Sequence, residues 1–307
     1  MSQDLIIKTT NLVKRYKNLT AVNELNLNVY KGDVFGFLGP NGAGKSTTIR
    51  MLLTLISPTS GNIEIFGKPL KNNRKEILSK IGAIVEKPDF YKYLSAYKNL
   101  EILGKISGAD VSKKSIMKIL EMVGLEKRAD SKVKTYSHGM KQRLGIAQAL
   151  LHDPELIILD EPTTGLDPQG IKEIRELILK LNKDFGKTIF LSSHILKEVE
   201  LICNRMIIIN KGQEKVEGLV SDLLNKKIED VSFKVSDSEK SKDLLINSNF
   251  DEKIKNKKPD EITLSLEKNE ISEVNKLLVQ NNIDVFEIHP HKSLEEYFLK
   301  ITEEEGK

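Results

Sequence analysis

A glycine-rich loop followed by a lysine and two hydroxyl residues is the first stretch whose residue types can do chemistry. Its nine residues, GPNGAGKST, contain the pattern GxxxxGK[ST]. Glycines let backbone N–H groups curl around phosphate oxygens, the lysine adds a cation, and the next hydroxyl can ligate Mg²⁺. We expect Ser46 to be that metal ligand, and we expect the nucleoside triphosphate to bind at Gly39, Pro40, Asn41, Gly42, Ala43, Gly44, Lys45, Ser46 and Thr47.

A pair of acidic residues supplies the second chemical feature. Asp160 and Glu161 directly follow the apolar run LIIL at positions 156–159. Asp160 can hold Mg²⁺ through water, and Glu161 can orient and deprotonate a water aimed at the γ-phosphate. The alternative is an acidic pair that only caps the next turn. A kinase would direct its catalytic groups at a second substrate, so an acid at this position favours a hydrolase.

A second anion site is predicted at YSHGMKQ, positions 136–142. Ser137 and Gly139 precede an apolar stripe with helical spacing at Met140, Leu144 and Ala147. Such a helix presents free N–H groups and the positive end of its dipole at its N-terminus. Because the chain already has a phosphate loop, these residues alone do not say which anion the second site would bind.

The elements that must position these residues read as an open α/β sheet. Apolar runs at 34–38 and 156–159 come before the phosphate loop and the acidic pair, and the run TIFLSS comes before His194. Four consecutive apolar residues are typical of a parallel strand buried on both faces. Ligands bind at the carboxyl ends of such strands, so we expect Asp160 and Glu161 to lie at a ligand site.

Composition sets the remaining bounds. The 307 residues are 39% hydrophobic and 30% charged, enough for a large core and two domains. Residues 1–218 hold 34 basic against 24 acidic side chains, and residues 219–307 hold 14 against 20. The single cysteine, Cys203, is expected to be a buried packing residue. The sequence contains no apolar run of the ~20 residues needed to span a membrane.

Over roughly residues 4–218 the chain resembles the ATP-binding subunit of an ABC transporter. GPNGAGKST resembles the Walker A loop, LIILDEP the Walker B strand, GLD at 165–167 the loop that couples two sites, and SSH at 192–194 the switch histidine. The resemblance implies a P-loop ATPase cassette with a RecA-like core, a β subdomain and a helical subdomain, which binds ATP and Mg²⁺. It also implies that Tyr16 stacks on adenine and that His194 contacts the γ-phosphate.

The same resemblance suggests a use for the second anion site. YSHGMKQ stands where the family has its signature, usually LSGGQ. In this family two cassettes pack head to tail, so Ser137 and Gly139 are expected to contact the ATP held by a second copy of the chain. His138 and Met140 depart from the usual signature. Glu86 stands where most relatives have glutamine, and it is expected to ligate Mg²⁺. Both departures resemble exporters of the bacitracin-resistance and lantibiotic-immunity type.

Residues 219–307 read as a separate α+β accessory domain. The predicted order is strand, helix, two strands, helix, strand, which suggests a small ferredoxin-like sandwich, and a final helix is expected in SLEEYFLKITEEE. His289 and His291, on either side of a proline, are expected in a loop. These residues offer no metal-ligand spacing, glycine loop or nucleophile.

We therefore expect an ATPase subunit that powers export of a drug or antimicrobial peptide through separate permease subunits, located in the cytoplasm at the inner face of the membrane. An importer subunit is the nearest alternative in chemistry. A soluble ABC ATPase acting on DNA would need a long coiled coil between the Walker A loop and the signature, and no heptad array lies between Thr47 and Ser137. A translation factor would need two cassettes in one chain. Glu161 and His194 argue against a module that binds nucleotide without turnover. No nucleic acid partner is expected.

Overall fold

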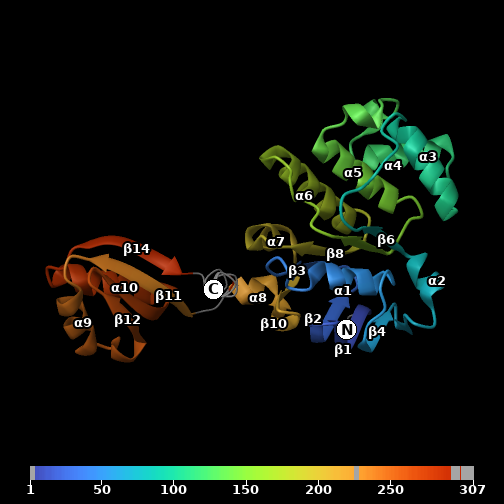
Figure 1. Ribbon diagram of the computed structural model, residues 1–307. Helices are drawn as coiled ribbons and strands as arrows, with labels where there is room; N and C mark the ends of the chain where they lie inside the picture. Colours follow the sequence, from blue (N-terminus) through green and yellow to red (C-terminus); the bar gives the residue numbers. More distant parts are fainter. Residues whose placement is uncertain (1–3, 225–227, 292–297, 299–307) are drawn as a thin grey trace. The chain divides into compact units, whose positions relative to one another are not determined.

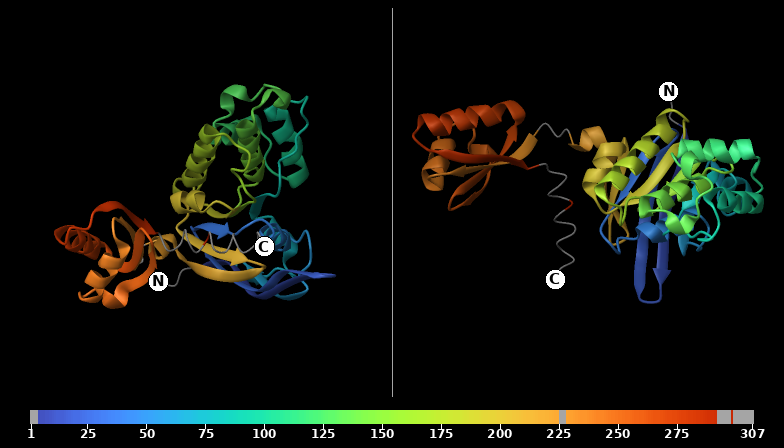
Figure 2. Two further views of the ribbon diagram at one scale, coloured as in Figure 1. Left: turned by 60° about the vertical axis from the view of Figure 1, so that its left-hand side comes forward. Right: turned by 90° about the horizontal axis from the view of Figure 1, so that it is seen from above.

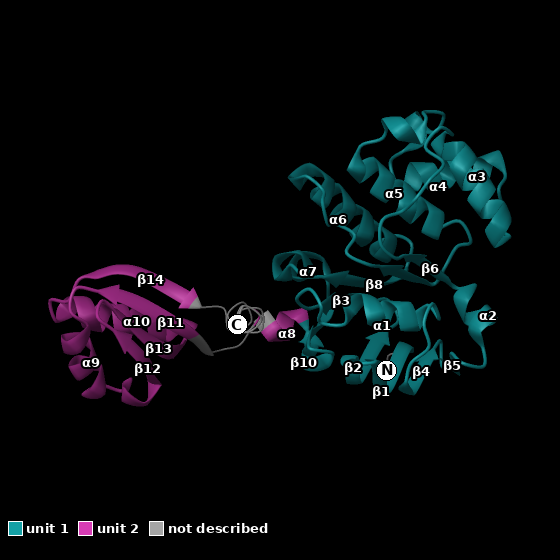
Figure 3. Ribbon diagram, in the orientation of Figure 1, with its two compact units in different colours: residues 1–219 teal, residues 220–307 magenta. Residues whose placement is uncertain are grey.

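The computed structural model describes residues 4–224, 228–291 and 298, which belong to two compact units (Figure 3). The first unit is Met1–Leu219 and the second is Val220–Lys307. The boundary expected from the sequence, after Gly218, is one residue earlier. Each unit has a hydrophobic core of its own.

A six-stranded sheet forms the centre of the first unit (Figure 1). Five consecutive strands of this sheet are parallel, and the sixth, at one edge, is antiparallel to its neighbour. The carboxyl ends of the parallel strands therefore meet at one edge, as the sequence predicts. In spatial order the strands are β10 (Gln213–Leu219), β9 (Arg205–Asn210), β3 (Val34–Leu38), β8 (Thr188–Ser193), β7 (Leu156–Leu159) and β6 (Ile81–Ile84).

A second, antiparallel sheet supplies the β subdomain. It has the order β2 (Leu19–Tyr30), β1 (Leu5–Tyr16), β4 (Ser60–Ile65) and β5 (Lys68–Pro69). One core joins the two sheets, with helix α1 (Lys45–Leu52) between them, since Leu27, Ile49 and Phe190 are all buried in it. Figure 2 shows the β1–β2 hairpin, in blue, extending away from the rest of this unit.

Helices α3 (Ala96–Ser107), α4 (Lys113–Met122) and α5 (His138–Ala149) gather into the helical subdomain (Figure 1). Each begins after a serine whose hydroxyl accepts a backbone N–H of the first turn. These serines are Ser95, Ser112 and Ser137. Helices α2 (Arg74–Leu78), α6 (Pro168–Lys183) and α7 (Leu196–Ile202) complete the unit. The structure thus confirms the cassette expected from the sequence, with both subdomains.

The second unit has four antiparallel strands and two helices after a short helix, α8 (Val220–Leu224). Its chain order is β11 (Ile228–Val235), α9 (Ser238–Ile246), β12 (Ile254–Lys258), β13 (Glu261–Glu267), α10 (Lys268–Gln280) and β14 (Val285–His291). The sheet order β12-β13-β11-β14 is that of a split βαβ fold. The predicted final helix at 293–305 lies outside the described residues, apart from Phe298.

One expectation for this unit is wrong. His289 and His291 lie in strand β14 instead of a loop. Pro290 between them opposes Val231 on β11, and β14 is an edge strand, where proline is tolerated because one side of the strand needs no ladder hydrogen bonds.

Two further expectations concern burial and membrane spans. Cys203 is buried, and its burial raises the pKa of the thiol, which suits a packing residue rather than a nucleophile. Across residues 4–224, 228–291 and 298, no helix combines the length and apolar character needed to traverse a bilayer.

Candidate functional site

The phosphate loop connects strand β3 to helix α1, so its backbone opens directly into a helix N-terminus. Gly44, the residue before the helix, has φ +106°, and a Cβ there would lie 2.4 Å from the carbonyl oxygen of Ala21. A side chain would therefore meet both an unfavourable backbone conformation and an immovable neighbour. Ser46 and Thr47 lie in the first turn of α1, where N–H groups have no partner within the helix.

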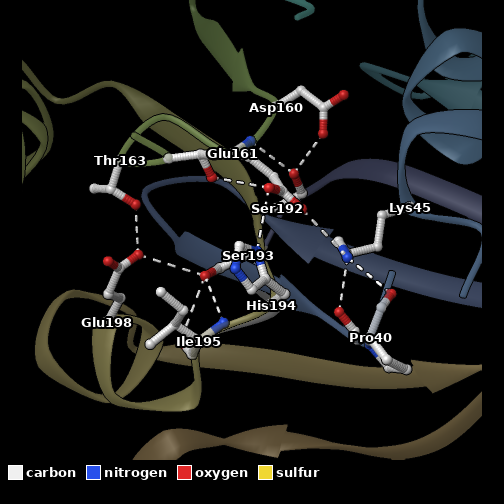
Figure 4. Close-up of polar contacts among 12 residues, drawn as sticks. Pro40, Lys45, Asp160, Glu161, Thr163, Ser192, Ser193, His194, Ile195 and Glu198 are labelled. Carbon is white, nitrogen blue, oxygen red and sulfur yellow. Dashed lines mark hydrogen bonds and ion pairs between the residues drawn. The ribbon is translucent and has the colours of Figure 1, made fainter. Parts of the chain in front are cut away.

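Lys45 is buried at the centre of this loop, with 5% of its side chain exposed. Its Nζ donates hydrogen bonds to the carbonyl oxygens of Gly39, at 2.7 Å, and Pro40, at 3.0 Å. The same Nζ lies 3.4 Å from Oε1 of Glu161 (Figure 4). The structure therefore brings the lysine of the loop to the acidic residue that follows strand β7, as the sequence predicts.

The Glu161 carboxylate contacts three other residues of the site, Lys45, Thr164 and His194. Its Oε2 accepts a hydrogen bond of 2.9 Å from the Thr164 hydroxyl and lies 3.1 Å from Nδ1 of His194. Burial by itself would raise the pKa of Glu161, but the Thr164 hydrogen bond and the neighbouring Lys45 and His194 together lower it below its ordinary value. A carboxylate that stays ionised at neutral pH can accept a proton from water.

Asp160 precedes Glu161 and is buried, with 7% exposed. Its Oδ1 accepts a hydrogen bond of 2.6 Å from the Ser192 hydroxyl, whose oxygen in turn accepts the Glu161 N–H at 2.9 Å. The two acidic side chains thus diverge: Glu161 extends to Lys45 and His194, whereas Asp160 is bound by Ser192 on the neighbouring strand (Figure 4).

Glu86 follows strand β6 and has φ +65°. Its carboxylate forms an ion pair with Arg50 of α1, and the two side chains are 66% and 40% exposed. Arg50 lies one helical turn after Ser46, so the pair connects the loop after β6 to the helix that starts at the phosphate loop. Ligation of Mg²⁺ by Glu86 stays a prediction.

The signature turn lies at the start of α5. Ser137 caps this helix by accepting the Met140 N–H at 3.2 Å. The ring of His138 packs against the GLD loop, where a Cβ on Gly165 would be 3.2 Å from its Cε1, and a Cβ on Gly139 would be 3.7 Å from Gly170. These contacts join the signature turn to the segment around the start of α6, and the contacts described for Ser137 and Gly139 involve neither Lys45 nor Glu161.

Tyr16 is the last residue of β1 and is 44% exposed. The following strand of the same hairpin reaches the phosphate loop, because Ala21 and Val22 lie against the position of Gly44. Lys14 places its Nζ 5.1 Å from the centre of the Tyr16 ring. The tyrosine therefore belongs to a hairpin that contacts the loop, and its stacking on adenine stays a prediction.

Three residues of the site were missed from the sequence: Ser192, Thr164 and Arg50. Ser192 left a signal, since it is a polar residue that follows three apolar residues in the buried strand TIFLSS. Thr164 and Arg50 left no such signal. Thr164 contacts Glu161 across a turn, and Arg50 contacts Glu86 because two distant segments of the chain lie close together.

The residues present suit a nucleotide with a hard divalent cation. Across the described part of the chain, no cluster of three or more His, Cys, Asp or Glu side chains could hold a metal. Mg²⁺ commonly takes only one or two protein oxygens and completes its shell with water and phosphate. The Ser46 hydroxyl and the Asp160 carboxylate match that donor set, and the buried Lys45 ammonium suits phosphate oxygens.

Comparisons with known proteins agree with this geometry. The family model "ABC transporter" matches residues 22–164. The bacitracin transport ATP-binding protein BcrA of Bacillus licheniformis is 49% identical over 298 residues, covering 96% of this chain and 97% of that protein. The lantibiotic transport ATP-binding protein SrtF of Streptococcus pyogenes is 46% identical over 208 residues, covering 68% of this chain and 88% of that protein.

Solved structures show the same fold. CbiO1 of Clostridium perfringens, part of the ABC transporter complex CbiONQ, has a TM-score of 0.67 at 29% identity, covering 73% of this chain and 92% of that one. The ATP-binding cassette MJ0796, solved as a dimer in a post-hydrolysis state with ADP and Pi, has a TM-score of 0.62 at 29% identity, covering 70% and 99%.

Proposed function

This chain belongs to the ABC transporter family as an ATP-binding, ATP-hydrolysing subunit, and from that we propose that it powers export of an antimicrobial peptide or similar amphiphile through separate permease subunits. The names of its relatives support this cargo class: bacitracin transport, lantibiotic transport and, in Bacillus subtilis, linearmycin resistance. The similarity to BcrA covers 96% of this chain, so it extends through the second unit.

One observation supports the hydrolytic role most directly. Glu161 lies between Lys45 of the phosphate loop and His194, the residue after strand β8, within 3.4 Å and 3.1 Å of their nitrogens. In the proposed mechanism Lys45 binds phosphate oxygens, and Glu161 orients a water and accepts its proton. His194 holds the Glu161 carboxylate and contacts the γ-phosphate. Mg²⁺, held by Ser46 and Asp160 with Glu86 nearby, would offset the charge of the phosphates.

We assign the signature turn to the ATP of a second subunit. Ser137 and Gly139 lie at the N-terminus of a helix of 12 residues, which favours an anion, and the contacts described for them involve neither Lys45 nor Glu161. A head-to-tail dimer would bring this turn to the partner's phosphate loop. The dimeric cassette MJ0796 shows that proteins of this fold associate in pairs.

We assign residues 219–307 to an accessory domain without a part in phosphate chemistry, because every site residue named above lies upstream. We place the protein at the inner face of the membrane, bound there through the permease.

The decisive experiment is purification of the chain with its membrane partner. A tagged chain is extracted from membranes in detergent, the co-purifying permease is identified, and the complex is reconstituted into vesicles. Bacitracin or a lantibiotic is expected to stimulate ATP hydrolysis severalfold, with Glu161→Gln as the inactive control. Stimulation by a periplasmic-type binding protein and its solute, and by no peptide, would instead identify an importer.

A further inference from the structure

Ser192 lies on β8 at the point where β7 ends. The register pairs Leu159 with Leu191, so Ser192 stands beside Asp160. Its side chain is fully buried, with 0% exposed, and its hydroxyl is used twice. It donates to Oδ1 of Asp160 at 2.6 Å and accepts the Glu161 N–H at 2.9 Å (Figure 4). One oxygen atom therefore bonds to both acidic residues of the site.

The two bonds act on different properties of their partners. The bond to Oδ1 fixes the Asp160 carboxylate at one oxygen, so the carboxylate can present its other oxygen without rotating. The bond from the Glu161 N–H stabilises an unusual backbone, because Glu161 has φ +47°, a conformation that residues with a Cβ rarely adopt. That conformation turns the Glu161 side chain toward Lys45 and His194 while Asp160 points elsewhere.

The neighbouring serine does not share this role. Ser193 follows Ser192 on the same strand, and successive side chains of a strand face opposite sides. The Ser193 hydroxyl accepts the Ile195 N–H at 3.0 Å and lies 3.5 Å from Glu198. The contact with the acidic pair is therefore specific to position 192, although both serines are buried.

We propose that Ser192 is a positioning residue for the reaction: its hydroxyl sets the orientation of Asp160 toward the metal and holds the backbone conformation that aims Glu161 at the attacking water. The proposal rests on the roles assigned above to Asp160 and Glu161. It adds a group that touches neither ATP nor metal and acts through both acidic residues. Partners of this kind typically change metal affinity or activity by about 10–100-fold when they are removed.

The test compares three variants of the full chain. Ser192→Ala removes the hydroxyl, and Ser192→Thr restores it. Thr188→Val is the matched control, because Thr188 is also buried on β8 and its hydroxyl accepts a backbone N–H, that of Gly32 at 3.0 Å, at the far end of the strand. Binding of the fluorescent analogue TNP-ATP is measured in EDTA and across a Mg²⁺ titration, followed by steady-state ATP hydrolysis.

Ser192→Ala is expected to leave TNP-ATP affinity in EDTA unchanged. It should raise about tenfold the Mg²⁺ concentration at which the Mg²⁺-dependent change in TNP-ATP binding is half complete. At saturating Mg²⁺ it should lower kcat about tenfold and leave KM for ATP within about twofold of the wild-type value. Ser192→Thr should recover most of both losses, and Thr188→Val should show neither. Should Ser192→Ala not fold, Ser192→Cys keeps a weak donor of similar size and should shift both values in the same direction by less.

Two outcomes would overturn the proposal: a wild-type Mg²⁺ profile in Ser192→Ala or Ser192→Cys, or losses in Thr188→Val equal to those in Ser192→Ala. Asp160→Asn separates this failure from failure of the site assignment. A normal Mg²⁺ profile in Asp160→Asn would show that Asp160 does not hold the metal. A strong shift in Asp160→Asn beside none at position 192 would show that only the role of Ser192 is wrong.

Discussion

Nδ1 of His194 lies 3.1 Å from Oε2 of Glu161, which joins the residue after strand β8 to the second residue after strand β7. Glu161 has φ +47° and His194 is 35% exposed, so the pair forms at the open end of the sheet and not within its core. The contact places an imidazole ring at one oxygen of the proposed general base, Oε2, while Lys45 lies nearest the other, Oε1.

Replacement of Glu161 by glutamine is expected to abolish turnover and preserve ATP binding. Glutamine keeps the size of the side chain but cannot accept a proton, and general base catalysis is typically worth ~10²–10⁴ in rate. Phosphate release and calorimetric ATP affinity measure the two properties. Glu155→Gln is the matched control, because Glu155 lies just before the other end of β7 and pairs on the surface with Lys80 at 2.9 Å. Hydrolysis by Glu161→Gln at the wild-type rate would show that another group is the base.

Mixed dimers test whether the signature turn serves the partner's ATP. With Lys45→Ala in one subunit and Ser137→Ala in the other, both lesions should fall in one composite site and leave the second intact. With both lesions in one subunit, each site should carry one. Loss of a hydrogen bond to a charged group costs roughly 1.5–3 kcal/mol, or about one to two decades in occupancy.

The measurement is nucleotide trapped in dimers purified through two different tags. The arrangement with lesions in separate subunits should trap more. If the double mutant paired with wild type keeps the intact site instead, Ser137 acts on the ATP of its own subunit, and the head-to-tail assignment is incorrect.

The ion pair between Arg50 and Glu86 predicts that replacing its two members changes the Mg²⁺ requirement in opposite directions. If Glu86 ligates Mg²⁺, Arg50 competes for its carboxylate. Arg50→Gln should then lower the Mg²⁺ concentration needed for TNP-ATP binding, and Glu86→Gln should raise it, each severalfold. Exposed ion pairs contribute about 0–1 kcal/mol to stability, so neither variant should unfold the chain.

The control is Glu76→Gln, which breaks another exposed pair, with Lys68, away from the site. Equal Mg²⁺ profiles in Arg50→Gln, Glu86→Gln and Glu76→Gln would exclude Glu86 as a ligand. A higher Mg²⁺ requirement in both Arg50→Gln and Glu86→Gln would indicate that the ion pair acts as a unit, by holding the loop after β6 against α1.

Glu217 predicts how stability depends on pH. Burial, and then the nearby charge of Glu214, raise the pKa of Glu217 on strand β10 to about 7, against the opposing effect of Arg205. The folded chain therefore binds this proton more tightly than the unfolded chain. The stabilisation is fully present below the ordinary glutamate pKa and is lost as the pH rises through about 7.

The thermal unfolding midpoint of the wild type should accordingly fall between about pH 5 and about pH 8, and Glu217→Gln should flatten that fall. Glu214→Gln should flatten it less, since it removes only a neighbouring charge. An unchanged slope in Glu217→Gln would mean that Glu217 is ionised across this range.

The sequence by itself determined the cassette and its phosphate loop, and it offered Lys45, Asp160, Glu161 and His194 as the expected site residues. These residues could be predicted because local patterns specify them: a glycine-rich turn before a helix, and polar residues directly after apolar runs that must be buried strands. Parallel pairing then brings the ends of those strands to one edge, whatever the length of the intervening chain. The second unit was predictable for the same reason, because its strands and helices alternate with clear periodicity.

Only the tertiary structure decided which partner each of these residues has. Ser192 meets Asp160 because β8 pairs with β7 in one register, and a shift by one residue would put Ser193 there instead. Arg50 meets Glu86 because the loop after β6 passes close to α1, and His138 covers Gly165 because α5 packs against α6. Such contacts depend on the three-dimensional approach of segments far apart in the chain, and no local pattern of residues records that approach.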